Sequence, residues 1–277
     1  MTPPDLLYHP QEGPSRDSFL VKNKILKALG AKPLNKKGIE KEFAVFRRKV
    51  FRYVVEPFGI LNDAISANKK ILFEGAQGVL LDNDWGTYPY VTASNILSGS
   101  LTHYAGIAPQ KINNILGVSK AYTTRVGEGP FPTELNNSIG DKIREIGGEY
   151  GATTGRKRRC GWLDLELLKF AVKVNGFTEI AITKLDILDS FPEIKVATHY
   201  MLKGKEVNYE NLETDDLRRV KPIYKSFKGW KEKTAGINNF KKLPKRAKEY
   251  ILFIEKQLGA PIKFVSTGSK RNETIRV

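Results

Sequence analysis

The sequence predicts an α/β protein in which a mostly parallel central sheet is flanked by helices. Short apolar runs at 70–74, 179–183 and 262–265 are each followed by loop residues, as buried strands in such a sheet are. Stretches with helical spacing separate these runs, and strands that alternate with helices form parallel sheets. At 277 residues, 40% of them hydrophobic, the chain is long enough for one large domain or two small ones.

The N-terminal residues divide into an arm and a helical segment. Residues 1–17 contain prolines at positions 3, 4, 10 and 14 and few periodic apolar positions, so we expect an extended arm. We assign 18–277 to one domain, whose first part, 18–69, has helical spacing. Gly30 is expected to end the first helix, Pro57 to end or kink the second, and a third helix closes by residue 68.

The predicted strand at 70–74 delivers a loop at its carboxyl end, where open α/β sheets bind their ligands. Gln77 lies in that loop, and its amide offers one acceptor and two donors to the edge of a purine. A glutamine after a strand is ordinarily only a turn residue. The next residues, 85–90, are aromatic and irregular, and Ser94 is expected to cap a helix that runs to His103.

Two further segments lead to a binding loop. After a strand at 112–118, residues 125–130 are predicted to form a loop in which glycines let the backbone approach a ligand. Ser138 is expected to cap an amphipathic helix that ends at the glycine pair 147–148. This helix runs directly into the cationic stretch 149–162.

The stretch 149–162 has the composition of an anion-binding loop. Gly151 and Gly155 permit positive φ angles and close backbone approach, and they bracket two threonines. Four consecutive cations follow, of which Arg156, Arg158 and Arg159 can bind a carboxylate or phosphate through paired hydrogen bonds. A charge run by itself is usually a solvated loop. The glycines and hydroxyls in front of this one favour a ligand site.

A second polar pattern follows the strand at 179–183, which itself comes after a predicted helix at 163–174. The strand ends in Lys184-Leu185-Asp186. An aspartate in this place can accept hydrogen bonds from the N1–H and exocyclic amine of guanine, a pair that adenine lacks, while the lysine stem covers the base. The ordinary explanation of a lysine and an aspartate so close together is a surface ion pair.

The C-terminal part is predicted to contain a hairpin and a last helix–strand unit. An alternating pattern that turns at 203–204 predicts the hairpin, and 194–240 is expected to form a peripheral subdomain. Pro244 opens a helix that Gly259 closes. The final strand ends in Ser266-Thr267-Gly268.

Charge and cysteine content limit the possible functions. With 46 Lys and Arg against 30 Asp and Glu, the chain carries +16, which attracts nucleic acid, membrane surfaces or phosphorylated metabolites. No apolar run approaches the roughly 18 residues of a membrane span, and residues 1–5 lack signal-peptide features, so we expect a soluble cytoplasmic protein without a membrane partner. The single cysteine, Cys160, excludes an internal disulfide; its cationic neighbours can lower its pKa, but we favour an incidental residue. The three histidines are scattered, so we predict no zinc site.

Four blocks of the sequence together resemble adenylosuccinate synthetase. They are 73–78 (Phe-Glu-Gly-Ala-Gln-Gly), 86–92 (Gly-Thr-Tyr-Pro-Tyr-Val-Thr), 123–134 (Thr-Thr-Arg-Val-Gly-Glu-Gly-Pro-Phe-Pro-Thr-Glu) and 151–164 (Gly-Ala-Thr-Thr-Gly-Arg-Lys-Arg-Arg-Cys-Gly-Trp-Leu-Asp). The similarity runs from about Lys22 to Val277. It implies a P-loop-NTPase-like fold that lacks its N-terminal part. It also implies a ligase, homodimeric and cytoplasmic, that joins IMP and L-aspartate to adenylosuccinate in purine biosynthesis, with GTP as co-substrate and Mg²⁺ as cofactor.

The resemblance also assigns residues to each substrate. The matching IMP contacts are Gln77, Thr92, Val126 and Arg156; the aspartate contacts are Ala152, Thr153, Thr154, Gly155, Arg156, Lys157 and Arg158; and the GTP contacts are Arg158, Lys184, Leu185, Asp186, Ser266, Thr267 and Gly268. Arg156 is implied to bridge aspartate and IMP. Ser269 stands where the family usually has proline, and we expect it to loosen that turn.

The catalytic groups of the family have no counterpart in this sequence. The family's general base, a histidine and a glycine-rich phosphate loop precede the matched region, and neither Gly-x₄-Gly-Lys-[Ser/Thr] nor Gly-Asp-Glu-Gly-Lys-Gly-Lys occurs here. We therefore assign no catalytic residue and no metal ligand, expect the Mg²⁺ ligands mostly outside the chain, and expect the chain alone to be inactive. Three explanations stay open: a split enzyme whose N-terminal half is a separate chain, a truncated chain, or a remnant that binds ligands without turnover.

The alternative is a non-catalytic polyanion-binding protein derived from the same fold. The charge of +16 and aromatic residues expected to be exposed, such as Trp85 and Trp230, would then serve single-stranded nucleic acid. The basic residues are dispersed rather than gathered in one stripe, which disfavours nucleic acid. The ligase hypothesis demands that the cationic loop, Gln77 and the lysine–aspartate pair converge around a single cavity.

Overall fold

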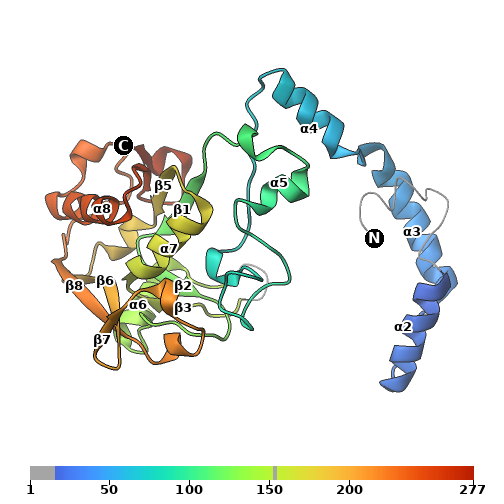
Figure 1. The fold of residues 1–277 in the computed structure, drawn as a ribbon, viewed down its shortest axis with the longest axis horizontal. Coiled ribbons are helices and arrows are strands. Elements are labelled where there is room, and N and C mark those ends of the chain that lie inside the picture. Colours follow the sequence, from blue (N-terminus) through green and yellow to red (C-terminus); the bar gives the residue numbers. More distant parts are fainter. Residues whose placement is uncertain (1–15, 152–154) are drawn as a thin grey trace. The chain divides into compact units, whose positions relative to one another are not determined.

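The described residues, 16–151 and 155–277, form two units in a computed structural model (Figure 1). The first unit holds the chain up to residue 72 together with 105–107, and the second holds 73–104 and 108–277. The arm predicted at 1–17 lies outside the described residues as far as residue 15, and a helix already begins at Arg16. None of the helices in the described ranges combines the length and apolar character that crossing a membrane requires.

Helices make up the first unit. They are α2 (Arg16–Ala28), α3 (Lys36–Val50), the short 3₁₀ helix η1 (Phe51–Tyr53) and α4 (Pro57–Ser66). The side chain of Asn35 caps α3 by accepting a hydrogen bond from the backbone N–H of Gly38 at 3.2 Å. Pro57 begins α4 and neither ends nor kinks a longer helix, because its fixed φ and missing N–H suit the first turn. Neither α3 nor α4 contains a buried residue.

A four-stranded sheet forms the centre of the second unit. Its strands are β1 (Leu116–Lys120), β5 (Glu179–Thr183), β9 (Ile262–Ser266) and β10 (Thr274–Arg276), in the order β1-β5-β9-β10. β1, β5 and β9 are parallel and β10 is antiparallel, which confirms the predicted mostly parallel sheet. β1 begins at Leu116 rather than at residue 112, because its partner β5 begins with Glu179, opposite Leu116.

Three helices pack with this sheet around the main core: α6 (Ser138–Gly147), α7 (Leu165–Asn175) and α8 (Lys245–Leu258) (Figure 1). The helix ends predicted at Gly148 and Gly259 are confirmed, since both glycines adopt left-handed φ angles, 57° and 65°, that end a helix without strain. Asn137, not Ser138, caps α6, with its side chain accepting from the backbone N–H of Ile139 at 3.0 Å. The six-residue helix α5 (Ser100–Ala105) precedes β1.

Two smaller sheets complete the second unit. β2 (Thr123–Arg125) pairs with β3 (Arg159–Gly161), and β6 (Glu193–Leu202) pairs with β4 (Leu163–Asp164), β7 (Lys205–Val207) and β8 (Lys221–Lys228). The hairpin predicted to turn at 203–204 is therefore present. β8 was not predicted, because its sequence, Lys-Pro-Ile-Tyr-Lys-Ser-Phe-Lys, is mostly polar and does not keep a strict alternation of apolar and polar residues. Trp230, just beyond β8, is buried in the main core.

No strand forms at 70–74, which corrects the prediction of a buried strand there. The side chain of Leu72 is 93% exposed. A strand needs a neighbour for its backbone N–H and C=O groups, and a short apolar run by itself does not supply one. Among the described strands, β1 is the outermost on its side of the sheet and pairs with β5 alone, with Val118 70% exposed.

The helix predicted from Ser94 begins instead at Ser100. The buried carboxylate of Asp82 accepts a hydrogen bond from the backbone N–H of Ile96 at 2.7 Å, and the amide oxygen of Asn175 accepts from that of Ser98 at 2.8 Å. Asn175 thus takes the N–H of Ser98, which a helix capped by Ser94 would direct to the carbonyl of Ser94, and Asp82 holds the N–H of Ile96 from outside the segment. Residues 85–90 are irregular, as predicted.

Candidate functional site

The predicted guanine-nucleotide contacts lie at the carboxyl edge of the parallel strands. Lys184 follows β5 directly in a left-handed conformation, with φ of 59°, and Ser266 ends the neighbouring strand β9. Leu185 is buried and anchors the tripeptide, while Asp186 is half-buried. Burial raises the pKa of Asp186 above its usual value. The two predicted GTP-binding segments are thus brought side by side.

The turn after β9 is held by its own hydrogen bonds. Ser266 Oγ donates to the carbonyl of Gly268 at 2.6 Å, and the buried Thr267 Oγ1 donates to the carbonyl of Ile237 at 2.7 Å. Lys270 N–H donates to Glu273 Oε2 at 2.9 Å and closes the following turn. Hydrogen bonds therefore hold the chain both before and after Ser269, the residue that we expected to loosen this turn.

A buried carboxylate, that of Glu149, joins the cationic loop to Lys184-Leu185-Asp186, the tripeptide predicted to bind guanine and called the guanine tripeptide below. Arg158 Nη1 donates to Glu149 Oε2 at 2.7 Å, and Lys184 Nζ lies 3.3 Å from Glu149 Oε1. The same carboxylate accepts from Lys120 Nζ at 2.8 Å on both oxygens and from Tyr122 Oη at 2.6 Å. Burial by itself would raise the pKa of Glu149, but the hydrogen bonds from Lys120, Tyr122 and Arg158 prevail and lower it to about 2.

This centre was not predicted, although Glu149 opens the cationic stretch. Lys120 ends β1, Tyr122 follows it, and Lys184 comes after β5, so the donors come from distant parts of the chain. One signal was available, because a single acidic residue stood in front of four cations. That residue had no assigned role.

The cationic loop is closed by backbone hydrogen bonds. Gly151 N–H donates to the carbonyl of Arg156 at 2.9 Å, and Gly155 N–H donates to that of Gly151 at 2.8 Å. Gly155 has a φ of 64°, the left-handed conformation that its sequence position predicted. Lys157 pairs with Tyr150 in an isolated bridge. The predicted aspartate contacts Ala152, Thr153 and Thr154 lie outside the described residues.

Two arginines tie the loops that carry the predicted IMP contacts. The buried Arg125 donates through Nη2 to Thr87 Oγ1 at 2.8 Å and through Nε to the carbonyl of Glu128 at 2.9 Å, so it links the aromatic loop to the loop after β2. Arg159 Nη1 donates to the carbonyl of Gly129 at 2.8 Å, which links the latter loop to the cationic stretch. Neither arginine was predicted to have this role.

These links bring two of the four predicted IMP contacts together. Arg156 Nη1 lies 3.8 Å from the position that a Cβ atom on Gly127 would occupy, next to the half-exposed Val126. Thr92 lies at the end of the aromatic loop and its N–H donates to the carbonyl of Leu81 at 2.8 Å. Gln77 is exposed with a φ of 70°, and no hydrogen bond among the described residues connects it to the others. The strand expected to position Gln77 is absent.

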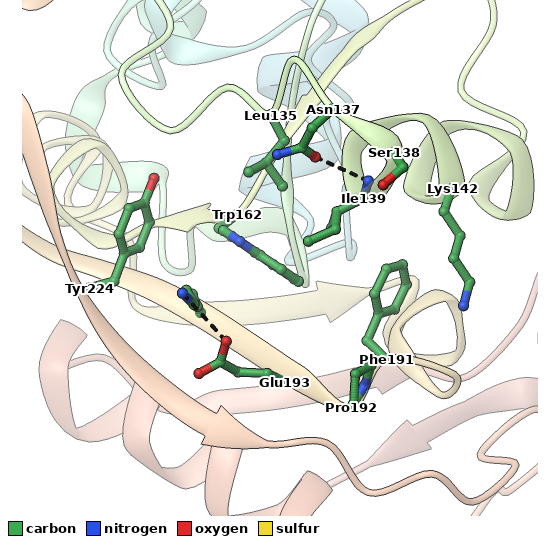
Figure 2. A pocket seen from close by; sticks show the side chains of 11 residues that line it. Leu135, Asn137, Ser138, Ile139, Lys142, Trp162, Phe191, Pro192, Glu193 and Tyr224 are labelled. Atoms are coloured by element: carbon green, nitrogen blue, oxygen red, sulfur yellow. Dashed lines mark hydrogen bonds and ion pairs between the residues drawn. The ribbon is translucent and has the colours of Figure 1, made fainter.

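Two cavities of the second unit lie elsewhere. One, of about 490 Å³, is lined by Trp162, Phe191, Tyr224 and Lys142, among others; Figure 2 shows their side chains around it. The other, of about 300 Å³, lies beside Asp82 and α5. No residue predicted to contact IMP, aspartate or GTP lines either of these two cavities.

Cys160 and Trp230 are both buried. Burial, with a contribution from the nearby Glu149 carboxylate, raises the pKa of the Cys160 thiol to about 11, which agrees with an incidental residue and not with a reactive thiolate. Trp230 donates through Nε1 to Asp189 Oδ1 at 2.7 Å and is 3% exposed, so it offers no stacking surface for a nucleic acid. The expectation that it is an exposed aromatic was wrong.

Comparison with known proteins gives consistent matches. The sequence model described as adenylosuccinate synthetase matches residues 13–275. The chain is 51% identical over 258 residues to the adenylosuccinate synthetase of Thermodesulfovibrio yellowstonii and 48% identical over 262 residues to that of Clostridium perfringens. These matches cover 93% and 95% of this chain, but 60% and 61% of the relatives. The solved structure of fully ligated adenylosuccinate synthetase from Plasmodium falciparum superposes with a TM-score of 0.89 at 37% identity, covering 93% of this chain and 62% of that one.

Proposed function

Because this chain belongs to the adenylosuccinate synthetase family, we propose that it forms the substrate-binding part of an enzyme that joins IMP and L-aspartate, using GTP. The observation that carries the proposal is the shared carboxylate of Glu149, which holds Arg158 of the cationic loop and Lys184 of the guanine tripeptide in one cluster. Two segments assigned to different substrates are thereby kept within reach of each other.

We propose that the cationic loop binds the aspartate substrate and faces IMP. Arg156 bridges aspartate and IMP, which is supported by the position of its guanidinium beside Gly127 and Val126. Thr153 and Thr154 hold the aspartate carboxylate. Arg158 contacts both aspartate and the GTP side, in keeping with its hydrogen bond to Glu149. A guanidinium can bind a carboxylate with two parallel hydrogen bonds, which suits a loop that must orient a small dicarboxylate.

We propose that Asp186 selects guanine. Its carboxylate follows a strand end and can accept from both N1–H and the exocyclic amine of guanine, whereas adenine offers no such donor pair. The buried Leu185 prevents the tripeptide from shifting. The backbone of Ser266-Thr267-Gly268, at the end of the adjacent strand, forms the other wall of this proposed base site.

The phosphate chemistry is proposed to come from a part of the fold that this chain does not contain. The chain spans about 60% of the length of the curated relatives it matches. No three His, Cys, Asp or Glu side chains gather in the described residues to hold a metal ion. We therefore place the Mg²⁺ ligands, the general base and the phosphate loop in the remaining part of the enzyme.

We propose that this remaining part joins the sheet at β1. Among the described strands, β1 has one unpaired edge, and its apolar Leu116 and Val118 are exposed. An open, apolar strand edge readily accepts another strand. The strand can come from a separate N-terminal half or from the same longer polypeptide.

We also propose a cytoplasmic homodimer, for which the exposed apolar residues of α2–α4, such as Ile25, Phe46 and Phe58, offer contact surface.

The experiment is a reconstitution. The purified chain is mixed with the N-terminal half of a relative that carries the phosphate loop, and adenylosuccinate is measured from IMP, L-aspartate and GTP. We expect product only when both parts and Mg²⁺ are present, and less product when ATP replaces GTP. A mixture that binds all three substrates yet forms no product would count against the ligase and in favour of a remnant.

A further inference from the structure

We propose that Glu149 is a positioning residue that couples the aspartate loop to the guanine site, so that occupancy of one strengthens binding at the other. The inference rests on the proposed function, because it uses the substrates assigned to Arg158 and Lys184. Its basis is a single buried carboxylate shared by side chains that belong to two different binding segments.

The position of Glu149 is set by the end of helix α6. Its backbone N–H donates to the carbonyl of Arg144 at 2.9 Å, directly after the left-handed Gly148 that ends the helix. The carbonyl of Glu149 accepts from the backbone N–H of Arg158 at 2.9 Å, and Arg144 Nε donates to the carbonyl of Arg158 at 2.8 Å. The backbone hydrogen bond thus places Arg158 next to Glu149 independently of the ion pair between their side chains.

The guanine side is held at the same place. Lys184 Nζ donates to the carbonyl of Gly147 at 2.5 Å and lies 3.3 Å from the Glu149 carboxylate. The carboxylate is fully buried, whereas the Arg158 and Lys184 side chains are 29% and 35% exposed. Each cation therefore has one side on the carboxylate and another side free to approach solvent or a ligand.

Charge makes the cluster a coupling element. Lys120, Arg158 and Lys184 surround the Glu149 carboxylate, so three positive charges share this one buried negative charge, and Lys184 also interacts electrostatically with Asp186. A like charge nearby disfavours the ionised form, and an opposite charge favours it. An anionic substrate at the aspartate loop adds negative charge beside Arg158, relieves the repulsion among the three cations, and leaves the carboxylate more firmly on Lys184. By linkage, a guanine nucleotide held by Lys184 must strengthen aspartate binding to the same extent.

A purely structural role predicts a different outcome. If Glu149 only stabilised the fold, removing its charge would lower the stability of the chain but would leave the two affinities independent in the molecules that stay folded. Coupling instead requires that the ratio of two affinities change. This ratio is the quantity to measure.

The test uses the full chain and Glu149→Gln, which keeps the shape and an acceptor for Tyr122 but removes the charge. The affinity for GDP is measured by calorimetry with and without saturating L-aspartate and IMP. For the unmodified chain we expect the two ligands to tighten GDP binding by about fivefold, the lower end of common coupling. For Glu149→Gln we expect a ratio of about one. Glu145→Gln, which changes an exposed glutamate on α6, and Tyr122→Phe, which keeps all charges, should both retain the fivefold ratio.

A folded Glu149→Gln variant with an unchanged ratio would overturn the proposal. A second measurement covers the case in which that variant does not fold. Hydrogen exchange of residues 155–162 is compared between the unmodified chain and Lys184→Met, with Lys142→Met as the control on an exposed lysine of α6. We expect about tenfold faster exchange in Lys184→Met only, and equal exchange in all three would reject the link.

The second measurement also separates the two hypotheses. It needs no ligand, so it reports on the link through Glu149 even if the chain binds neither GDP nor aspartate. Failure of binding by the unmodified chain would count against the proposed function, whereas normal exchange in Lys184→Met would count against Glu149 as the connection.

Discussion

Replacing Asp164 with asparagine examines how a buried carboxylate affects the stability of the second unit. Asp164 is 1% exposed at the start of α7, where Oδ1 accepts from the backbone N–H of Leu167 at 3.3 Å and Oδ2 accepts from Tyr200 Oη at 2.7 Å. Burial raises the pKa of Asp164 to about 7, from an ordinary 3.8, although the hydrogen bonds from Tyr200 and Leu167 act in the opposite direction. Asparagine keeps a capping oxygen and has no proton to lose.

The raised pKa sets the sign and size of the effect. Between about pH 4 and pH 7 the folded protein keeps a proton that the unfolded chain has released, so the free energy of unfolding falls as pH rises through this window. The folded and unfolded pKa values of Asp164 differ by about 3, and a difference of one corresponds to about 1.4 kcal/mol. The free energy of unfolding is therefore lower by about 4 kcal/mol at pH 7 and above. Asp164→Asn should not suffer this loss.

The assay is urea unfolding of both proteins at several pH values between about 5 and 8, followed by tryptophan fluorescence. We expect the stability advantage of Asp164→Asn to grow by a few kcal/mol across that range. Asp215→Asn, at an exposed aspartate whose side chain caps no helix, should follow the unmodified protein at every pH. The reasoning is refuted if the pH curves of the unmodified protein and of Asp164→Asn stay parallel.

Three other substitutions address the sheet edge, the packing and the base site. Val118→Lys, on the exposed edge of β1, should leave the chain folded by circular dichroism but reduce product in the reconstitution at least about tenfold, and normal product would dismiss β1 as the junction. Gly161→Ala places a Cβ atom 2.2 Å from the carbonyl oxygen of Thr133 and should lower the free energy of unfolding by about 1–3 kcal/mol. The control Gly78→Ala, whose Cβ atom meets nothing within 4 Å, should leave it unchanged, and equal urea midpoints for the two variants would contradict this reasoning. Asp186→Asn should weaken GDP binding about tenfold or more, because the amide cannot accept both guanine donors. It should improve binding of the xanthine analogue of GDP, whose C2 carbonyl accepts from the new amide. A variant that still prefers GDP would show that Asp186 does not contact the base.

Sequence by itself determined the elements whose signals are local. The strand 179–183 was predicted with its observed bounds, because a short apolar run between polar residues is a property of those residues alone. The helix ends at Gly148 and Gly259 were also predicted, since a left-handed glycine completes the hydrogen bonds of the turn just before it. The binding segments that the motifs of the family imply are likewise predictions from neighbouring residues alone.

Only the tertiary structure decided what depends on residues far apart in the chain. The run at 70–74 is as apolar as a strand, but the described residues do not pair with it. The predicted helix does not start at Ser94, because Asp82 and Asn175, from other parts of the chain, accept hydrogen bonds from the backbone N–H groups of Ile96 and Ser98. The convergence of the lysine of the guanine tripeptide with the cationic loop was anticipated, but its cause, the Glu149 carboxylate, was not. The partners of a buried charge come from segments that are far apart in the chain, and the periodicity of a sequence does not predict which of these segments pack together.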